Sequence, residues 1–273
     1  MSTTEQTHQQ DLERLKSLRY MDDDFMTVCL ADNFEGVELI LRIVLGRENI
    51  KIKSVRTQEP LKNLQGRSAI LDVHVVDSTK KEFDIEIHRK DARAGAKRAR
   101  HNSSLLDAHI LKAGDDTEDI PDSFVIFITE NDVMGKNQSI YHIQRYVETN
   151  EGKELFGDGS HILYVNGKYR GNDEVGKLMY DFSCTNPEDM NYEALAKRAR
   201  YFKQDEKGVA AMCKIMEDMR NEAAQKAELK NARETATRMI KKGKMSLEEI
   251  AEYIPLLSFE ELKEIEAEVM QLA

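Results

Sequence analysis

The chain has few cysteines, and they are poorly placed for cross-links. The three present, Cys29, Cys184 and Cys213, lie far apart and never in a C-x-x-C spacing. This pattern argues against a disulfide framework or a structural zinc site, so we expect reduced thiols.

Long apolar runs are lacking as well. The best candidate, residues 39–45, is interrupted by Arg42 and is much shorter than the roughly 18 residues that a membrane span needs. The first ten residues are polar, so no secretory signal is predicted. We expect a cytoplasmic protein with no membrane partner.

Tryptophan is absent, and no aromatic residue lies between Arg89 and His101, so nothing predicts base stacking on single-stranded nucleic acid. The net charge of −10 also disfavours indiscriminate binding of nucleic acid, because affinity for phosphates comes from lysine and arginine. Residues 89–101 are the exception, with one acid and these basic side chains: Arg89, Lys90, Arg93, Lys97, Arg98 and Arg100. This segment can bind an anion, or it can be a solvated helix that neutralises nearby acids.

What is present is an α/β pattern followed by a helical tail. The 273 residues, 40% of them hydrophobic, are enough for a substantial core. Hydrophobic periodicity predicts helices at 10–18, 22–45 and 92–112, and strands at 50–55, 71–75, 83–88, 123–129, 140–143 and 161–165. The continuous apolar run at 123–129 is typical of a strand covered on both faces.

We therefore expect a core over residues 20–185 and a helical tail over 190–273. In the tail, a long helix is predicted to end at Gly243, and Ser246 and Ser258 each begin an S-x-x-E capping box. The two short helices that follow are acidic, which favours packing or homo-oligomerisation over contact with DNA.

Acids and histidines alternate with apolar residues in the two runs at 71–75 and 83–88. Since successive side chains of a strand point to opposite faces, one face carries these residues: Asp72, His74, Asp84, Glu86 and His88. A hairpin centred on Thr79 would place Asp72 opposite Glu86, with Cβ atoms roughly 4.5–5.5 Å apart.

Two carboxylates that close need a proton or a cation between them, and hard oxygen ligands suit Mg²⁺ or Mn²⁺. The alternative is an amphipathic hairpin whose polar face is solvated. His74 is expected to hydrogen-bond to Asp84. On the helix at 92–112 we expect a basic face with Arg93, Lys97 and Arg100 and an alanine-rich face against the sheet.

Asp72, followed after thirteen residues by Glu86-Ile87-His88, resembles the D…(D/E)-x-K signature of the PD-(D/E)XK nuclease superfamily. Residues 64–72, 83–87, 97–100 and 178–182 are similar to segments of the Rpn-type, or recombination-promoting nuclease, putative transposases. The resemblance implies a restriction-endonuclease-like mixed sheet flanked by helices. It also implies a Mg²⁺-dependent DNA endonuclease associated with mobile elements.

Carried over to this chain, the resemblance makes Asp72, Glu86 and the backbone carbonyl of Ile87 the metal ligands. His88 stands where the superfamily has lysine and Rpn-type proteins usually have glutamine, so its role in activating water is open. Lys97 ranks first for supplying positive charge to the phosphate. The residues expected to contact DNA are Arg89, Lys90, Arg93 and Arg100.

Two other functions remain open at this stage. His88 in place of lysine fits a catalytically impaired DNA-binding or protein-interaction module that retains the fold. The acidic and histidine face could also bind a transition metal for an unrelated hydrolysis.

Overall fold

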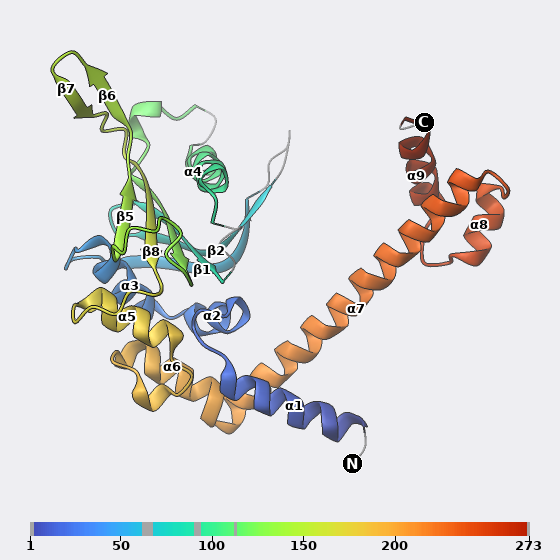
Figure 1. The fold of residues 1–273 in the computed structure, drawn as a ribbon, viewed down its shortest axis with the longest axis horizontal. Helices are drawn as coiled ribbons and strands as arrows, with labels where there is room; N and C mark the ends of the chain where they lie inside the picture. The colour runs from blue at the N-terminus through green and yellow to red at the C-terminus, as the bar shows by residue number, and fades with distance from the viewer. Residues whose placement is uncertain (1–2, 62–67, 90–93, 112–113, 272–273) are drawn as a thin grey trace. The chain divides into compact units, whose positions relative to one another are not determined.

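The computed structural model describes residues 3–61, 68–89, 94–111 and 114–271 (Figure 1). The chain divides into two compact units, Met1–Val209 and Ala210–Ala273. The division lies later than the expected boundary at 185–190, because α6 (Glu193–Gln204) belongs to the first unit. There the Tyr20 hydroxyl donates to the carbonyl of Leu195 (2.9 Å), and Arg198 donates to the carbonyl of Ala31 (3.1 Å).

The first unit is an α/β structure built on a mixed sheet, as the sequence predicted. Its strand order is β1-β2-β3-β4-β8-β5. The strands are β1 (Ile52–Leu61), β2 (Ala69–Asp77), β3 (Glu82–His88), β4 (Ser123–Thr129), β5 (Ile140–Ile143) and β8 (Ser160–Asn166). β1, β2 and β3 are antiparallel, β3, β4 and β8 are parallel, and β5 is antiparallel to β8. A separate exposed hairpin that the sequence did not predict consists of β6 (Tyr146–Thr149) and β7 (Gly152–Leu155).

Helices cover both faces of this sheet. α4 (Ala96–Ile110) lies on one face, and α2 (Asp23–Leu30), α3 (Phe34–Leu45) and α5 (Glu174–Ser183) lie on the other (Figure 1). All seven residues of β4 are buried, which confirms that this strand is covered on both sides. α1 (Thr3–Ser17) and two 3₁₀ turns (Thr117–Asp119 and Pro187–Asp189) complete the described elements of the unit.

The expected single helix at 22–45 is wrong, since the structure divides it into α2 and α3. Asp32 takes a left-handed conformation (φ 53°) between them, and the Asn33 side chain caps α3 by accepting from the amide of Gly36 (3.0 Å). Asparagine is among the preferred N-cap residues. The N-cap at Asn33 therefore starts a second helix, whereas hydrophobic periodicity alone predicts a single one.

The hairpin of β2 and β3 has the predicted register. Val73 pairs with Ile85, and Val75 pairs with Phe83, so the pairing is centred on Thr79. Its polar face is not solvated, however. Asp84 and Glu86 are fully buried because α4 lies across this face, where Asn102 donates to Asp84 (3.4 Å). The burial of Asp84 and Glu86 therefore contradicts the alternative of a solvated polar face.

The second unit contains α7 (Glu206–Lys242) from Ala210 onward, with α8 (Leu247–Tyr253) and α9 (Phe259–Gln271). Gly243, at φ 60°, follows α7 as predicted. Both capping boxes form: Ser246 accepts from the amide of Glu249 and Ser258 from the amide of Glu261, each at 3.2 Å. The buried core of this unit consists of Ala236, Ile250, Ile254, Leu257, Leu262 and Ile265. No helix in the described part of the chain is both long and apolar enough to cross a membrane.

Candidate metal centre

Three side chains of the β2–β3 hairpin converge under α4. One ligand atom from each of Asp72, Glu86 and His88 lies within 4.8 Å of the others. Their exposed fractions are 8%, 0% and 6%. The period of two along each strand puts them on one face, and the register, continued one step beyond the Val73–Ile85 pair, places Asp72 opposite Glu86. The alternation predicted that the three share a face, and the assumed hairpin register predicted that Asp72 lies opposite Glu86.

Glu86 is the centre of the group. Its Oε2 atom lies 3.1 Å from Nε2 of His88 and accepts a hydrogen bond from Arg98 at 3.1 Å. Its Oε1 atom is buried and has no hydrogen-bond partner among the described residues. A buried carboxylate oxygen without a partner costs free energy. A cation or a proton bound at this oxygen would reduce that cost.

Asp72 is held by the backbone of the neighbouring strand. Its Oδ2 atom accepts from the amide of Ile87 at 3.2 Å. This contact aligns the two ligand-bearing strands, but it uses the amide of Ile87. The ligand role expected for the carbonyl of Ile87 stays a prediction.

Two of the buried acids, Asp72 and Asp84, have a raised proton affinity. Burial first, and then the charge of Glu86, raises the pKa of Asp72 from 3.8 to about 8. Burial and the charges of Glu86 and Asp72 likewise raise the pKa of Asp84 well above its ordinary value. The Oδ1 atom of Asp84 is also buried without a partner in the described chain. Ionising these groups together requires a cation nearby.

The donor set therefore fits a metal ion. Carboxylate oxygens suit hard divalent cations, and an imidazole nitrogen is tolerated by several metals. Asp72, Glu86 and His88 can hold a metal ion, and their chemistry alone does not select one.

The helix α4 brings Arg98 to the acids, where the sequence ranked Lys97. The Arg98 guanidinium contacts Glu86, and its side chain is 39% exposed. Lys97 and Arg100 are exposed on α4. Consecutive helical residues point about 100° apart. The rotation of α4 about its axis therefore decides whether Lys97 or Arg98 faces the sheet. Lys90 and Arg93 lie outside the described residues.

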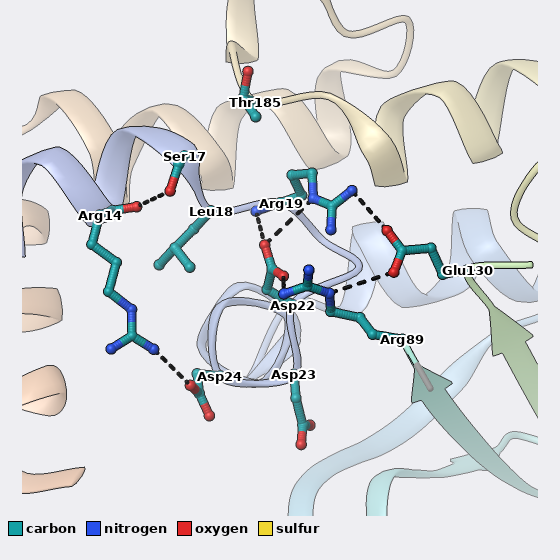
Figure 2. A pocket seen from close by; sticks show the side chains of 10 residues that line it. All are labelled: Arg14, Ser17, Leu18, Arg19, Asp22, Asp23, Asp24, Arg89, Glu130 and Thr185. Carbon is teal, nitrogen blue, oxygen red and sulfur yellow. Dashed lines mark hydrogen bonds and ion pairs between the residues drawn. The ribbon is translucent and has the colours of Figure 1, made fainter. Parts of the chain in front are cut away.

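Arg89, expected to contact DNA, is paired with acids beside a cavity of about 720 Å³ (Figure 2). Its guanidinium lies 2.7 Å from Asp22 and 3.5 Å from Glu130. Arg19 contacts the same two carboxylates, with its Nη1 atom 3.0 Å from Glu130. The two arginines and two acids alternate around one side of the cavity (Figure 2), and a phosphate bound there would compete with Asp22 and Glu130.

Asp23, on the wall of this cavity, adds to the raised pKa of Asp72, after burial and the charge of Glu86. None of the three residues of the candidate metal centre lines the cavity.

His74 is paired with Asp84 across the hairpin, but both of its ring nitrogens face other carboxylates, so the expected hydrogen bond to Asp84 is wrong. Its Nδ1 atom lies 2.5 Å from Glu59, and its Nε2 atom lies 2.8 Å from Glu82. Burial lowers the pKa of His74, but the hydrogen bonds with Glu82 and Glu59 outweigh it and the net change is upward. Glu59 comes from β1, whose pairing with β2 no local pattern revealed.

Sequence reasoning also missed Arg98 and Asn102. A usable signal existed: Arg98, Asn102 and Leu105 recur at four and three residues, the spacing of one helical face. The polar members of that face contact Glu86 and Asp84.

Comparison with protein-family models, with curated proteins and with solved structures finds no match to this chain. The structure itself defines an α/β protein with a buried acidic group able to hold a metal ion.

Proposed function

We propose that this protein is a metal-dependent DNA endonuclease that hydrolyses phosphodiester bonds. One observation carries the proposal: Asp72, Glu86 and His88 converge within 4.8 Å in a buried site where an oxygen of Glu86 has no partner in the described chain. Buried acids arranged in this way are suited to a divalent cation, and the oxygen-rich set favours Mg²⁺ or Mn²⁺. The transposase or recombination-promoting type comes from the sequence resemblance alone.

In this reading Asp72 and Glu86 hold the metal, with His88 and the carbonyl of Ile87 beside them. When bound, the metal would lower the pKa of a coordinated water and offset negative charge on the scissile phosphate. His88 is within hydrogen-bond distance of Glu86, so it can orient a water or accept its proton. Arg98 contacts Glu86 and is exposed enough to reach a phosphate as well.

DNA is the proposed substrate because the acids lie beside a basic segment in an otherwise acidic protein. Lys97 and Arg100 are exposed on α4, whose Arg98 reaches the site. Exposed cations near an acidic site suit a polyanion whose backbone passes the metal.

The test is cleavage of supercoiled plasmid DNA by purified protein with Mg²⁺ or Mn²⁺, and with a chelator. Asp72→Asn and Glu86→Gln should abolish cleavage while DNA binding persists. Glu82→Gln is the matched control: it makes the same change on the same strand, at a residue that contacts His74 outside the three-residue group. Its cleavage should remain.

Other outcomes lead to different conclusions. Absence of cleavage with either metal by folded, DNA-binding protein would contradict the nuclease and favour the impaired binding module. Cleavage that survives both substitutions would mean that the reaction occurs elsewhere. Phosphatase or esterase turnover without DNA cleavage would favour the unrelated hydrolase.

A further inference from the structure

Two histidines meet on the opposite face of the sheet from the buried acids. His142 is on the edge strand β5 and His161 is on β8, next to it. His142 pairs with Leu163, two residues along from His161, so both imidazoles point to the same side. Their Nε2 and Nδ1 atoms face each other at 3.0 Å.

We propose that His142 and His161 form a second metal site, which binds a transition-metal ion of the Cu²⁺ or Ni²⁺ type through two imidazole nitrogens. Metal–nitrogen bonds of about 2.0–2.1 Å to two atoms 3.0 Å apart give an angle at the ion of roughly 95°. That angle corresponds to adjacent positions of a square or octahedral shell. Cu²⁺ and Ni²⁺ adopt such geometry with imidazole ligands.

One of the two rings is held in place before any ion binds. His161 stacks on Phe124 with ring centroids 4.5 Å apart and planes 16° from parallel. His142 is exposed, so the remaining coordination positions would be open to water or a small anion. A site with one packed ring and one solvated ring is accessible to an ion and loses little side-chain freedom on binding.

The protonation state also suits coordination. Burial, and then Arg47, lowers the pKa of His142, while burial and the neighbouring His142 lower the pKa of His161. Both rings are therefore neutral at pH 7, as metal ligands must be. One neutral ring now donates its N–H to the other. Binding requires the donor to move its hydrogen to its other nitrogen, with no net release of a proton.

Arg47 opposes this site and offers a second test. Its guanidinium lies over the Phe124 ring at 5.5 Å, on which His161 stacks. Its positive charge weakens cation binding, so Arg47→Gln should increase affinity for the ion. A bound ion would link the four-residue edge strand β5 to β8 and raise the melting temperature of the protein.

The experiment is equilibrium dialysis of tag-free protein against Cu²⁺ and separately Ni²⁺, with electron paramagnetic resonance of the Cu²⁺ form. His142→Gln and His161→Gln should each lose one equivalent of bound ion and the spectral splitting from two imidazole nitrogens. His109→Gln is the matched control, since this exposed histidine hydrogen-bonds within its own helix, at the carbonyl of Leu105. It should bind as wild type does.

The double variant Asp72→Asn/Glu86→Gln separates this site from the buried acids. It should retain the histidine-dependent equivalent, whatever its DNA cleavage. Circular dichroism of the metal-free variants checks that each is folded. Wild-type ion binding by folded His142→Gln and His161→Gln would overturn the proposal, as would an equal loss in His109→Gln.

Discussion

The carboxyl group of Asp72 should make the metal-free protein less stable as the pH rises. Burial and the charge of Glu86 raise its pKa from 3.8 to about 8. Between these values the folded protein holds a proton that the unfolded chain has lost. The contribution of this group to stability is therefore most favourable below pH 3.8 and falls steadily until the pH passes about 8.

The size of the effect follows from the same pKa change. Within the window, stability should fall by about 1.4 kcal/mol for each pH unit through this group. Over the whole window the loss would approach about 6 kcal/mol as an upper limit. The charge of Asp72 helps to raise the pKa of Asp84, so these two carboxyls titrate as a coupled pair, and the pH dependence belongs to the pair rather than to Asp72 alone.

The assay is urea unfolding in the presence of a chelator at several pH values between 5.5 and 7.5, comparing wild type with Asp72→Asn. The asparagine removes the titrating group, so the free energy of unfolding should fall less with pH in the variant. Glu154→Gln, an exposed acid on β7, controls for the change in net charge. Parallel pH profiles for wild type and Asp72→Asn would refute the reasoning. Adding Mn²⁺ should stabilise wild type more at high pH than at low pH, because the ion binds the deprotonated acids.

Three further predictions follow from other contacts. His74→Gln should lower the free energy of unfolding by about 2 kcal/mol below pH 6.5, and by less as the pH rises through the elevated pKa of this histidine. Urea unfolding at pH 5.5 and pH 8.5 tests this. An equal loss at both pH values would contradict it. Arg98→Ala should lower the rate of plasmid cleavage by about 10²-fold and Lys97→Ala should lower it much less; the reverse order in a time course would restore Lys97 as the main cation. Ser246→Ala removes the capping box of α8 and should cost about 1 kcal/mol by thermal unfolding, so an unchanged melting curve would mean that the cap contributes nothing.

The sequence was enough to predict the hairpin that carries the site. An apolar residue at every second position fixes which face of each strand is buried. Both apolar faces pack against one core, so the register can shift only by an even number of residues. Any such shift keeps Asp72 and Glu86 on the same side of the hairpin. The apolar run of β4 was equally informative, because a strand without polar alternation must be covered on both faces.

Local patterns could not reveal contacts that depend on how elements pack. His74 is held by Glu59 of β1 and by Glu82. The contact with Glu59 depends on the antiparallel pairing of β1 with β2. The choice between Lys97 and Arg98 depends on the rotation of α4 about its axis, which tertiary packing sets. The division of residues 22–45 at Asn33 depends on a capping bond that competes with the continuous helix.

The protein itself provides the comparison that explains its buried acids. Asp181 is also fully buried, and both of its oxygens are used: they accept from the amides of Asn191 and Tyr192 and from the Asn191 side chain, at 2.7–2.8 Å. That is how a buried carboxylate is satisfied when its role is to hold a loop. Glu86 and Asp84 are equally buried, yet each keeps an oxygen with no partner in the described chain. Such oxygens lower stability rather than raise it. The metal ion of the proposed function would offset the charge of Glu86, and the raised pKa of Asp84 means that a proton reduces the charge there.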